Sequence, residues 1–191
     1  MIARIFTVLS LALLSAGGAK AQGTPEMPMP PMSQPVEAHK WLHQFEGEWT
    51  TTMLAPGQTL EDAGDAAPKG TMSFKMLGEL WLINNVSGNM GGGVTVNAIL
   101  TIGYDESKKK YIGSWVDSFM NIMWLYEGTV DESGKKLSLE ADGPNMMGGE
   151  GTIRYRDSYE FKSDDHIVLT SEAQMDGTWT TYVTADIRRK K

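Results

Sequence analysis

Cysteine is absent from the 191 residues of this sequence. Disulfide bonds are therefore excluded, as is lipid attachment at a cysteine, and a folded domain must be stabilised by its core alone. Histidine is scarce, with three residues, and no G-x-S-x-G motif supplies a nucleophile. A hydrolytic triad would have one plausible base, and these absences argue against such a triad.

Basic residues are fewer than acidic ones, 17 against 24. Two of them, Arg4 and Lys20, lie in a segment that we expect to be removed, which leaves 15 basic residues and a net charge of −9. Nucleic-acid binding needs a basic surface, and docking onto anionic lipid has the same requirement. The charge balance therefore predicts no nucleic-acid partner.

Long apolar runs are confined to the first residues of the chain. Arg4 supplies a positive start, Ile5 to Leu14 form an apolar core too short to span a bilayer, and residues 19–21 have the small-x-small pattern of a cleavage site. We predict a secretory signal peptide over residues 1–21, with an uncleaved membrane anchor as the alternative. The mature protein, beginning at Gln22, is expected to be periplasmic or secreted, with no stable membrane insertion after cleavage.

Residues 22–36 hold five prolines and no periodic apolar pattern. This composition predicts a flexible, partly polyproline linker that is rich in proline and methionine. Its thioethers could bind Cu(I), but so few of them are weak evidence, and we predict no metal there. Residues 37–191 then form a single domain, of a size that buries roughly 70% of its chain surface.

One short helix is expected at residues 36–45. Pro35 suits its first turn and Gly47 suits its exit. An apolar side, large enough for a lid or plug, is formed by Val36, Trp41, Leu42 and Phe45.

Two histidines of this helix, His39 and His43, are four residues apart and would share a face with Glu46 one turn further. The spacing permits metal binding. Lys40 stands where the HExxH motif needs its glutamate, so we predict neither a metal nor another cofactor.

After Gly47 the hydrophobic period changes from about 3.6 to about 2. Turn signals rich in aspartate, serine and glycine separate the alternating runs. Ten strands are predicted, near residues 48–54, 70–77, 79–88, 94–104, 109–119, 121–130, 135–141, 150–162, 166–175 and 178–189. Sequential strands joined by short turns are antiparallel neighbours, and closing the sheet removes its two sticky edges. We therefore predict an all-β, up-and-down (meander) barrel of about ten strands, with a two-sheet sandwich as the alternative.

Short motifs in a fixed order carry a family resemblance over residues 39–189. They are His39-Lys40-Trp41-Leu42, Gly47-Glu48-Trp49, Gly78-Glu79-Leu80-Trp81-Leu82, Gly103-Tyr104-Asp105, Gly113-Ser114-Trp115-Val116-Asp117-Ser118, Trp124-Leu125-Tyr126-Glu127-Gly128, Tyr155-Arg156-Asp157, Asp164-Asp165-His166 and Asp176-Gly177-Thr178-Trp179. In these motifs the chain resembles the bacterial family called domain of unknown function 1579. The resemblance implies a calycin-like barrel, related in shape to lipocalins and fatty-acid-binding proteins, and it implies no activity.

The same resemblance suggests how the barrel closes. In lipocalin-like barrels a Gly-x-Trp, here Gly47 and Trp49, opens the first strand, and an arginine from the last strand lies across the indole. Arg188 and Arg189 are the candidates for that arginine. The contact would be a cation–π pair worth about 0.5–2 kcal/mol.

Three carboxylates fall within predicted strands instead of turns. In strict alternation Asp117 shares a face with Trp115. Asp157 shares one with Tyr155, and Glu127 lies on a face with apolar neighbours. If these faces point inward, the acids sit among aromatic side chains in a cavity, and each needs a hydrogen-bonded or cationic partner. Outward, solvated positions are the alternative, since one bulge would reverse a face.

Aromatic side chains from several strands could line a pocket for an apolar ligand. We select Trp81, Trp115, Trp124 and Tyr155 for the cavity wall, although ordinary core packing would use the same residues. Residues 122–126 are apolar on both faces. This pattern predicts that one face meets the helix or a second subunit, and it leaves a homodimer open.

The leading hypothesis is therefore an exported barrel that binds a small apolar molecule without transforming it. Its candidate ligand-binding residues are Trp81, Trp115, Asp117, Trp124, Glu127, Tyr155 and Asp157. The first alternative is a cofactor-free isomerase or hydrolase that uses Asp117 or Asp157 as general acid–base. The second is an interaction module of the cell envelope, built on residues 122–126.

Overall fold

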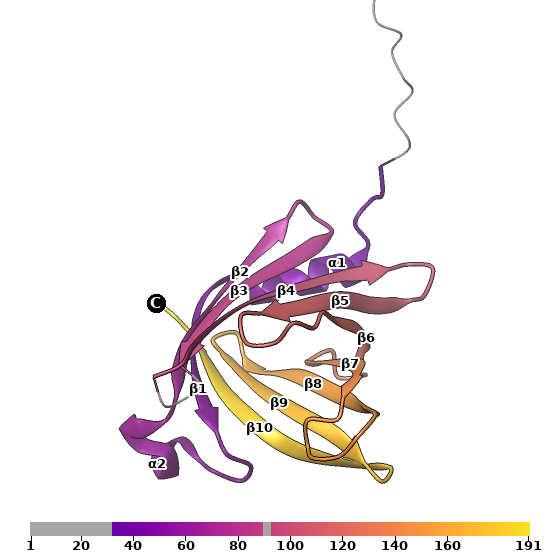
Figure 1. Ribbon diagram of the computed structural model, residues 1–191. Helices are drawn as coiled ribbons and strands as arrows, with labels where there is room; N and C mark the ends of the chain where they lie inside the picture. The colour runs from indigo at the N-terminus through magenta and orange to yellow at the C-terminus, as the bar shows by residue number, and fades with distance from the viewer. Residues whose placement is uncertain (1–31, 90–92) are drawn as a thin grey trace, which may run out of the picture. The chain divides into compact units, whose positions relative to one another are not determined.

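Ten antiparallel strands close into one barrel (Figure 1). The computed structural model describes residues 32–89 and 93–191. The predicted signal peptide, the predicted linker as far as residue 31 and the glycine-rich residues 90–92 lie outside the described residues. In the described part of the chain, no helix combines the length and the apolar character needed to cross a membrane.

The barrel strands follow one another in chain order, and each pairs with the next. They are β1 (Gly47–Leu54), β2 (Lys69–Leu77), β3 (Trp81–Asn89), β4 (Thr95–Asp105), β5 (Lys110–Asp117), β6 (Trp124–Val130), β7 (Lys136–Pro144), β8 (Thr152–Ser163), β9 (His166–Met175) and β10 (Thr178–Arg189). Helix α1 (Glu37–Leu42) and the 3₁₀ turn η1 (His43–Phe45) precede β1. Helix α2 (Leu60–Ala63) and the 3₁₀ turn η2 (Gly64–Ala66) lie between β1 and β2. Because β1 also pairs with β10, the predicted meander barrel is confirmed and the two-sheet sandwich is wrong.

The first and last strands are joined by Arg189. Its guanidinium carbon lies 4.0 Å from the centre of the Trp49 ring, directly across the β1–β10 pairing. Its nitrogens donate hydrogen bonds to the backbone carbonyls of Gln44, Glu46 and Asp164. Arg188, the other candidate, instead donates to the Asp186 carboxylate at 2.7 Å and makes no contact with the indole. Of the two predicted arginines, Arg189 therefore makes the cation–π contact with the indole, whereas Arg188 joins the closure through its backbone pairing with Thr50.

Alternation along the strands separates the core from the surface. On β4, Leu100 and Ile102 are almost completely buried. Ile99, which directly precedes Leu100 and points to the opposite face, is exposed. On β8, Tyr155 and Tyr159 are buried in the interior. Each buried square ångström of apolar surface contributes roughly 25 cal/mol, so the ring of inward faces supplies the main stabilisation of the domain.

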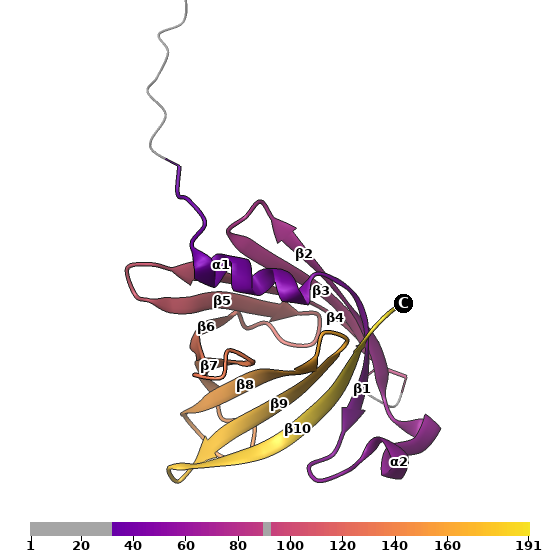
Figure 2. The same cartoon turned by 180° about the vertical axis from the view of Figure 1, so that it is seen from behind.

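Helix α1 and the turn η1 close one end of the barrel (Figure 2). Phe45 is completely buried, and its ring centre lies 4.8 Å from that of Phe161 near the end of β8. The Trp41 indole donates a hydrogen bond at 2.8 Å to the carbonyl of Gly134, in the turn between β6 and β7. The apolar side predicted for this helix thus acts as a plug.

The sequence analysis predicted one helix, and the structure contains a second, α2. The Thr59 hydroxyl accepts a hydrogen bond from the Asp62 amide at 3.1 Å, and the Asp62 carboxylate accepts one from the Thr59 amide at 3.0 Å. This capping box stabilises a single turn whose residues carry no buried side chain. Without an apolar face the turn has no helical periodicity, and the Thr-x-x-Asp spacing was its only signal.

The wall between β6 and β7 is hydrogen-bonded along only part of its length. Their pairing runs from Val130↔Leu137 to Glu127↔Glu140. Beyond it, among the described residues, residues 124–126 pair only with β5 and residues 141–144 pair only with β8. We call these two facing edges the seam. Backbone groups of the seam that point toward the gap have no strand partner.

Candidate functional site

A cavity of about 380 Å³ lies inside the barrel, toward the end opposite α1. Its mouth includes Lys69 at the start of β2, Asn89 at the end of β3 and Phe119 in the loop after β5. Apolar wall residues include Met72, Val86, Leu100, Leu139 and Leu169. Small-molecule sites typically have volumes of about 300–1,000 Å³ and mostly apolar walls with a few convergent polar groups. The cavity has this size and this character.

Asp157, on β8, is the polar centre of the cavity wall. The Tyr126 hydroxyl donates to its Oδ2 at 2.6 Å, and the Ser171 hydroxyl donates to its Oδ1 at 2.5 Å. The carboxyl keeps some accessible surface, but that surface faces the cavity because protein surrounds the group on its other sides. This burial raises the pKa of Asp157 above its ordinary value of 3.8, and the two hydroxyl donors oppose the rise. The structure thus places this predicted residue on the cavity wall.

Three tyrosines of the wall carry hydroxyls near this carboxyl. Burial raises the pKa of Tyr126, Tyr159 and Tyr182, and the neighbouring Asp157 adds to the rise in each case. All three therefore stay neutral at ordinary pH and can act as hydrogen-bond donors or acceptors. An ionised ligand group would meet these hydroxyls and one carboxyl.

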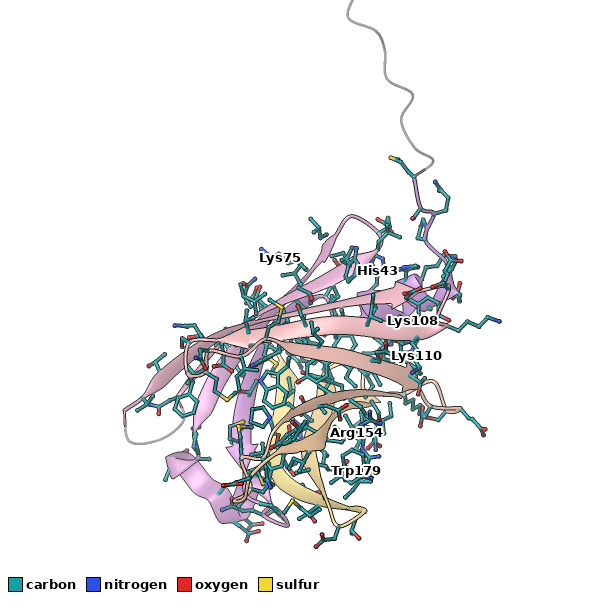
Figure 3. All side chains as sticks on the ribbon, turned by 45° about the vertical axis from the view of Figure 1, so that its right-hand side comes forward. His43, Lys75, Lys108, Lys110, Arg154 and Trp179 are labelled. Atoms are coloured by element: carbon teal, nitrogen blue, oxygen red, sulfur yellow. The ribbon has the colours of Figure 1, made fainter. Side chains whose placement is uncertain are left out.

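A bulge brings Tyr182 into this site. Strict alternation on β10 would put Tyr182 and Val183 on opposite faces, but the register shifts between Thr181 and Val183, and both side chains line the cavity. The same shift puts Trp179 on the outer wall, where the Arg156 guanidinium lies 4.1 Å from its ring centre (Figure 3).

Asp117 and Trp115 lie near the cavity mouth. The Trp115 indole donates to Asp117 Oδ2 at 2.8 Å. The backbone amides of Phe119 and Met120 donate to Oδ1 at 2.8 Å and 2.7 Å. The Asp117 carboxylate is therefore occupied by its own loop and positions the Trp115 ring, which leaves Asp157 as the carboxyl available to a ligand.

Trp124 and Tyr155 form an aromatic corner of the wall. Their ring centres are 5.1 Å apart and their planes meet at 84°. The Tyr155 hydroxyl donates to the Pro144 carbonyl at 2.7 Å and accepts from the Met146 amide at 2.9 Å. The ring thus holds the loop after β7 against the cavity.

Two predicted cavity residues lie on the outer wall instead, and their predicted positions are wrong. Trp81 is 38% exposed, and its indole covers Gly103, where a Cβ atom would lie 2.6 Å from the ring. Glu127 binds Lys108 at 2.6 Å and Lys110 at 2.8 Å, and these two lysines lower the pKa of its carboxyl to about 2 (Figure 3). Successive strand residues point to opposite faces, and in both strands the neighbouring residue takes the interior position.

The apolar run at residues 122–126 is divided between the two faces of β6. Trp124 and Tyr126 are buried inside the barrel. Met123 and Leu125 are 61% and 68% exposed on the outer wall, so α1 does not cover this face, and that alternative is wrong. A second subunit on the same face stays a prediction.

Sequence reasoning missed three polar residues of the interior. Ser171 and Tyr182 belong to the Asp157 cluster. Asn84, on β3, is completely buried, and its side-chain nitrogen and oxygen have no hydrogen-bond partner among the described residues. It pairs across the sheet with Leu100, a cavity residue. The signal was an asparagine on the otherwise apolar face of a strand.

The histidines of the first helix have structural contacts. His39 Nδ1 accepts a hydrogen bond from the Val36 amide at 3.0 Å, where α1 begins. His43 lies 2.9 Å from the Glu46 carboxylate and 3.4 Å from that of Glu79. Within residues 32–89 and 93–191, no three histidine or acidic side chains gather as a metal site.

Comparison with known proteins identifies a family and a fold. The family described as "Protein of unknown function (DUF1579)" matches residues 34–189. The crystal structure of Rv2717c from M. tuberculosis is similar with a TM-score of 0.56 and 12% identity, covering 83% of this chain and 100% of that one. The S-type phycobiliprotein lyase CPES from Guillardia theta is similar with a TM-score of 0.51 and 9% identity, covering 82% and 94%. At these identities the likeness concerns the fold alone. No curated protein matches the sequence at a significant level.

Proposed function

This chain belongs to the DUF1579 family, and we propose that it is an exported protein that binds one small, largely apolar molecule inside its barrel without transforming it. The observation that carries the proposal is the cavity of about 380 Å³, whose apolar and aromatic wall contains one buried carboxyl. Such a wall offers hydrophobic contact over most of a ligand and one directional polar contact. Export is inferred from the leader-like pattern of residues 1–21.

The size of the cavity supports a ligand over simple core packing. An unfilled hollow in a protein core lowers stability by about 24 cal/mol per Å³. Larger apolar side chains at several wall positions, Val86 and Leu169 among them, would occupy this space at no cost in hydrophobicity. A wall that instead keeps the space is better suited to holding a molecule.

Titration with the neutral dye N-phenyl-1-naphthylamine tests the binding proposal. We expect its fluorescence to rise on binding to the chain and to rise less with Val86→Phe, whose ring narrows the cavity. The matched control is Ile99→Phe, which introduces the same ring on the exposed outer wall and should bind as the unmodified chain does. A chain that binds neither this dye nor any component of a lipid extract would refute the proposal.

Expression of the full chain in a Gram-negative host tests export. We expect the protein in the periplasmic fraction with Gln22 as its first residue. Ala19→Arg should block cleavage, because the processing site requires small residues there. Cytoplasmic protein that retains Met1 would exclude this part of the proposal.

One observation favours a second candidate function. Asp157 combines a raised pKa with access to a cavity, as expected of a general acid–base in a cofactor-free isomerase or hydrolase. A panel of enolisable ketones and activated esters would test it. Turnover by the chain that disappears in Asp157→Asn would support catalysis, and turnover unaffected by that substitution would exclude this residue.

A further inference from the structure

The polar centre of the cavity has unused hydrogen-bonding capacity. Each oxygen of Asp157 accepts one short hydrogen bond, from Tyr126 or from Ser171. A carboxylate can accept about four hydrogen bonds, so both oxygens can accept another from a group in the cavity. The chain therefore presents acceptor capacity, and it is the ligand that must donate.

Charge inside the site is also unbalanced. Among the described residues, Asp157 forms no ion pair, since both its contacts are to neutral hydroxyls. The basic side chain on the cavity wall is Lys69, at the mouth, which is 59% exposed and lies 3.7 Å from Asp65. A buried carboxylate is strongly disfavoured unless a cation or several donors compensate it. A positively charged group on the ligand would supply the compensation that the Asp157 carboxylate lacks.

Aromatic rings next to this carboxyl are suited to the same group. Trp124 and Tyr155 meet edge to face at 5.1 Å, and Tyr155 and Tyr182 do so at 6.2 Å and 88°. Perpendicular rings on one cavity wall present ring faces in more than one direction. Ring faces attract ammonium groups by about 0.5–2 kcal/mol each, and the attraction is larger away from water.

Resting on the proposed function, we propose that the cavity ligand is an apolar amine whose protonated nitrogen binds Asp157 against the faces of Trp124, Tyr155 and Tyr182. The apolar body of the amine would occupy the part of the cavity lined by Met72, Val86, Leu100 and Leu139. A carboxylate in the same position would be repelled by the ionised form of Asp157. A neutral alcohol would donate one hydrogen bond but would leave the charge uncompensated.

Three decyl compounds that differ only in the head group test the inference: decylamine, decanol and decanoic acid. Each is titrated against bound N-phenyl-1-naphthylamine at neutral pH. We expect decylamine to displace the dye at a concentration at least about tenfold lower than decanol. Decanoic acid should be the weakest of the three.

Two variants separate the local contact from bulk electrostatics. Asp157→Asn should bring the amine to within about threefold of the alcohol while decanol binding persists. Asp142→Asn removes the same charge from the outer wall, where the carboxylate pairs with Arg154, and should keep the preference for the amine. If Asp157→Asn does not fold, the ¹³C shift of the Asp157 carboxyl in the unmodified chain serves instead. It should move on addition of decylamine and remain unchanged with decanol.

The outcomes distinguish this inference from the proposed function. Equal binding of decanol and decylamine, tighter binding of decanoic acid, or an amine preference that survives in Asp157→Asn would overturn the amine assignment and leave the binding barrel standing. Failure of the dye and of all three decyl compounds to bind would remove both.

Discussion

Gly143 lies directly beneath the Trp124 indole: a Cβ atom at this glycine would come within 2.1 Å of the ring. The indole fills the space that the missing side chain leaves, on the inner side of the seam between β6 and β7. The position of the largest aromatic side chain on this part of the cavity wall therefore depends on a residue without a side chain.

Gly143→Ala is expected to displace the indole and to destabilise the domain by about 1–3 kcal/mol, as overpacking of cores does. Urea denaturation measures the loss, and near-ultraviolet circular dichroism reports the ring. Gly88→Ala is the matched control, since its Cβ would meet its nearest atom at an ordinary 3.7 Å. Similar stabilities of the two variants would show that the Trp124 ring has room to move.

Arg189→Lys should lower stability by about 1–3 kcal/mol, because lysine cannot keep both the ring contact and several hydrogen bonds to carbonyls. Gly47→Ala should act in the same direction, since φ is +122° there and a Cβ would lie 2.9 Å from Arg189 Nη1. Arg188→Lys is the control and should cost less than about 1 kcal/mol, because the Arg188 side chain is 52% exposed and a lysine can still pair with Asp186. Equal losses for the two lysine variants, measured by thermal unfolding, would argue against closure by Arg189.

Asn84→Leu should raise stability by about 1–3 kcal/mol. The buried amide has no protein partner among the described residues, and replacing it by an apolar group of similar volume removes the desolvation penalty. Chemical denaturation of both proteins measures the difference. Lower stability of the variant would mean that the amide hydrogen-bonds to a molecule other than the chain, and would add Asn84 to the ligand site.

Asp157 should make stability depend on pH in a defined direction. The pKa of Asp157 is raised in the folded state above the unfolded value of 3.8. The contribution of this group to the free energy of unfolding is therefore full below pH 3.8 and is lost as the pH rises through the folded pKa. The stability of Asp157→Asn relative to the unmodified chain should therefore increase as the pH rises from the unfolded value of 3.8 to the raised folded pKa, and should stay level above it. Melting temperatures of both proteins across this range measure it. A constant difference would mean that the carboxyl ionises in the folded protein as it does in water.

Among the strand residues, backbone amide hydrogens should exchange fastest along the seam. Amides of residues 124–126 and 141–143 that face the gap have no strand partner, whereas residues 127–130 and 137–140 are paired across it. We expect exchange at least about tenfold faster in the first group. Mass spectrometry of peptic fragments, or NMR, would measure the rates. Equal protection on both sides of Glu127 would show that the seam closes in solution.

Local patterns predicted much of this molecule. The strict alternation of β8 correctly placed Tyr155 and Asp157 on one face, and that face is the inner one. The resemblance to lipocalin-like barrels, carried by the glycine and tryptophan of β1, implied the contact of the tryptophan with an arginine of the last strand, and the structure has that contact. Side-chain alternation and turn chemistry act over a few residues, so they can be read along the chain.

Three features could not be read in this way. The pattern of β3 and β6 does not say which face is inner, so Trp81 and Glu127 were placed inside when they lie outside. The bulge before Val183 reverses a face on β10 without a recognisable signal. The single turn α2 has no apolar face for a helical period to reveal.

By itself the sequence determined the number and order of the strands and their boundaries to within about three residues, because the period of the side chains and the turns between strands are local properties. Only the tertiary structure decided which groups meet in the cavity. The Ser171 hydroxyl is 14 residues away along the chain and reaches Asp157 through the β8–β9 pairing, whereas the Tyr126 hydroxyl is 31 residues away and reaches it because β6 and β8 lie on either side of β7 in the curved wall.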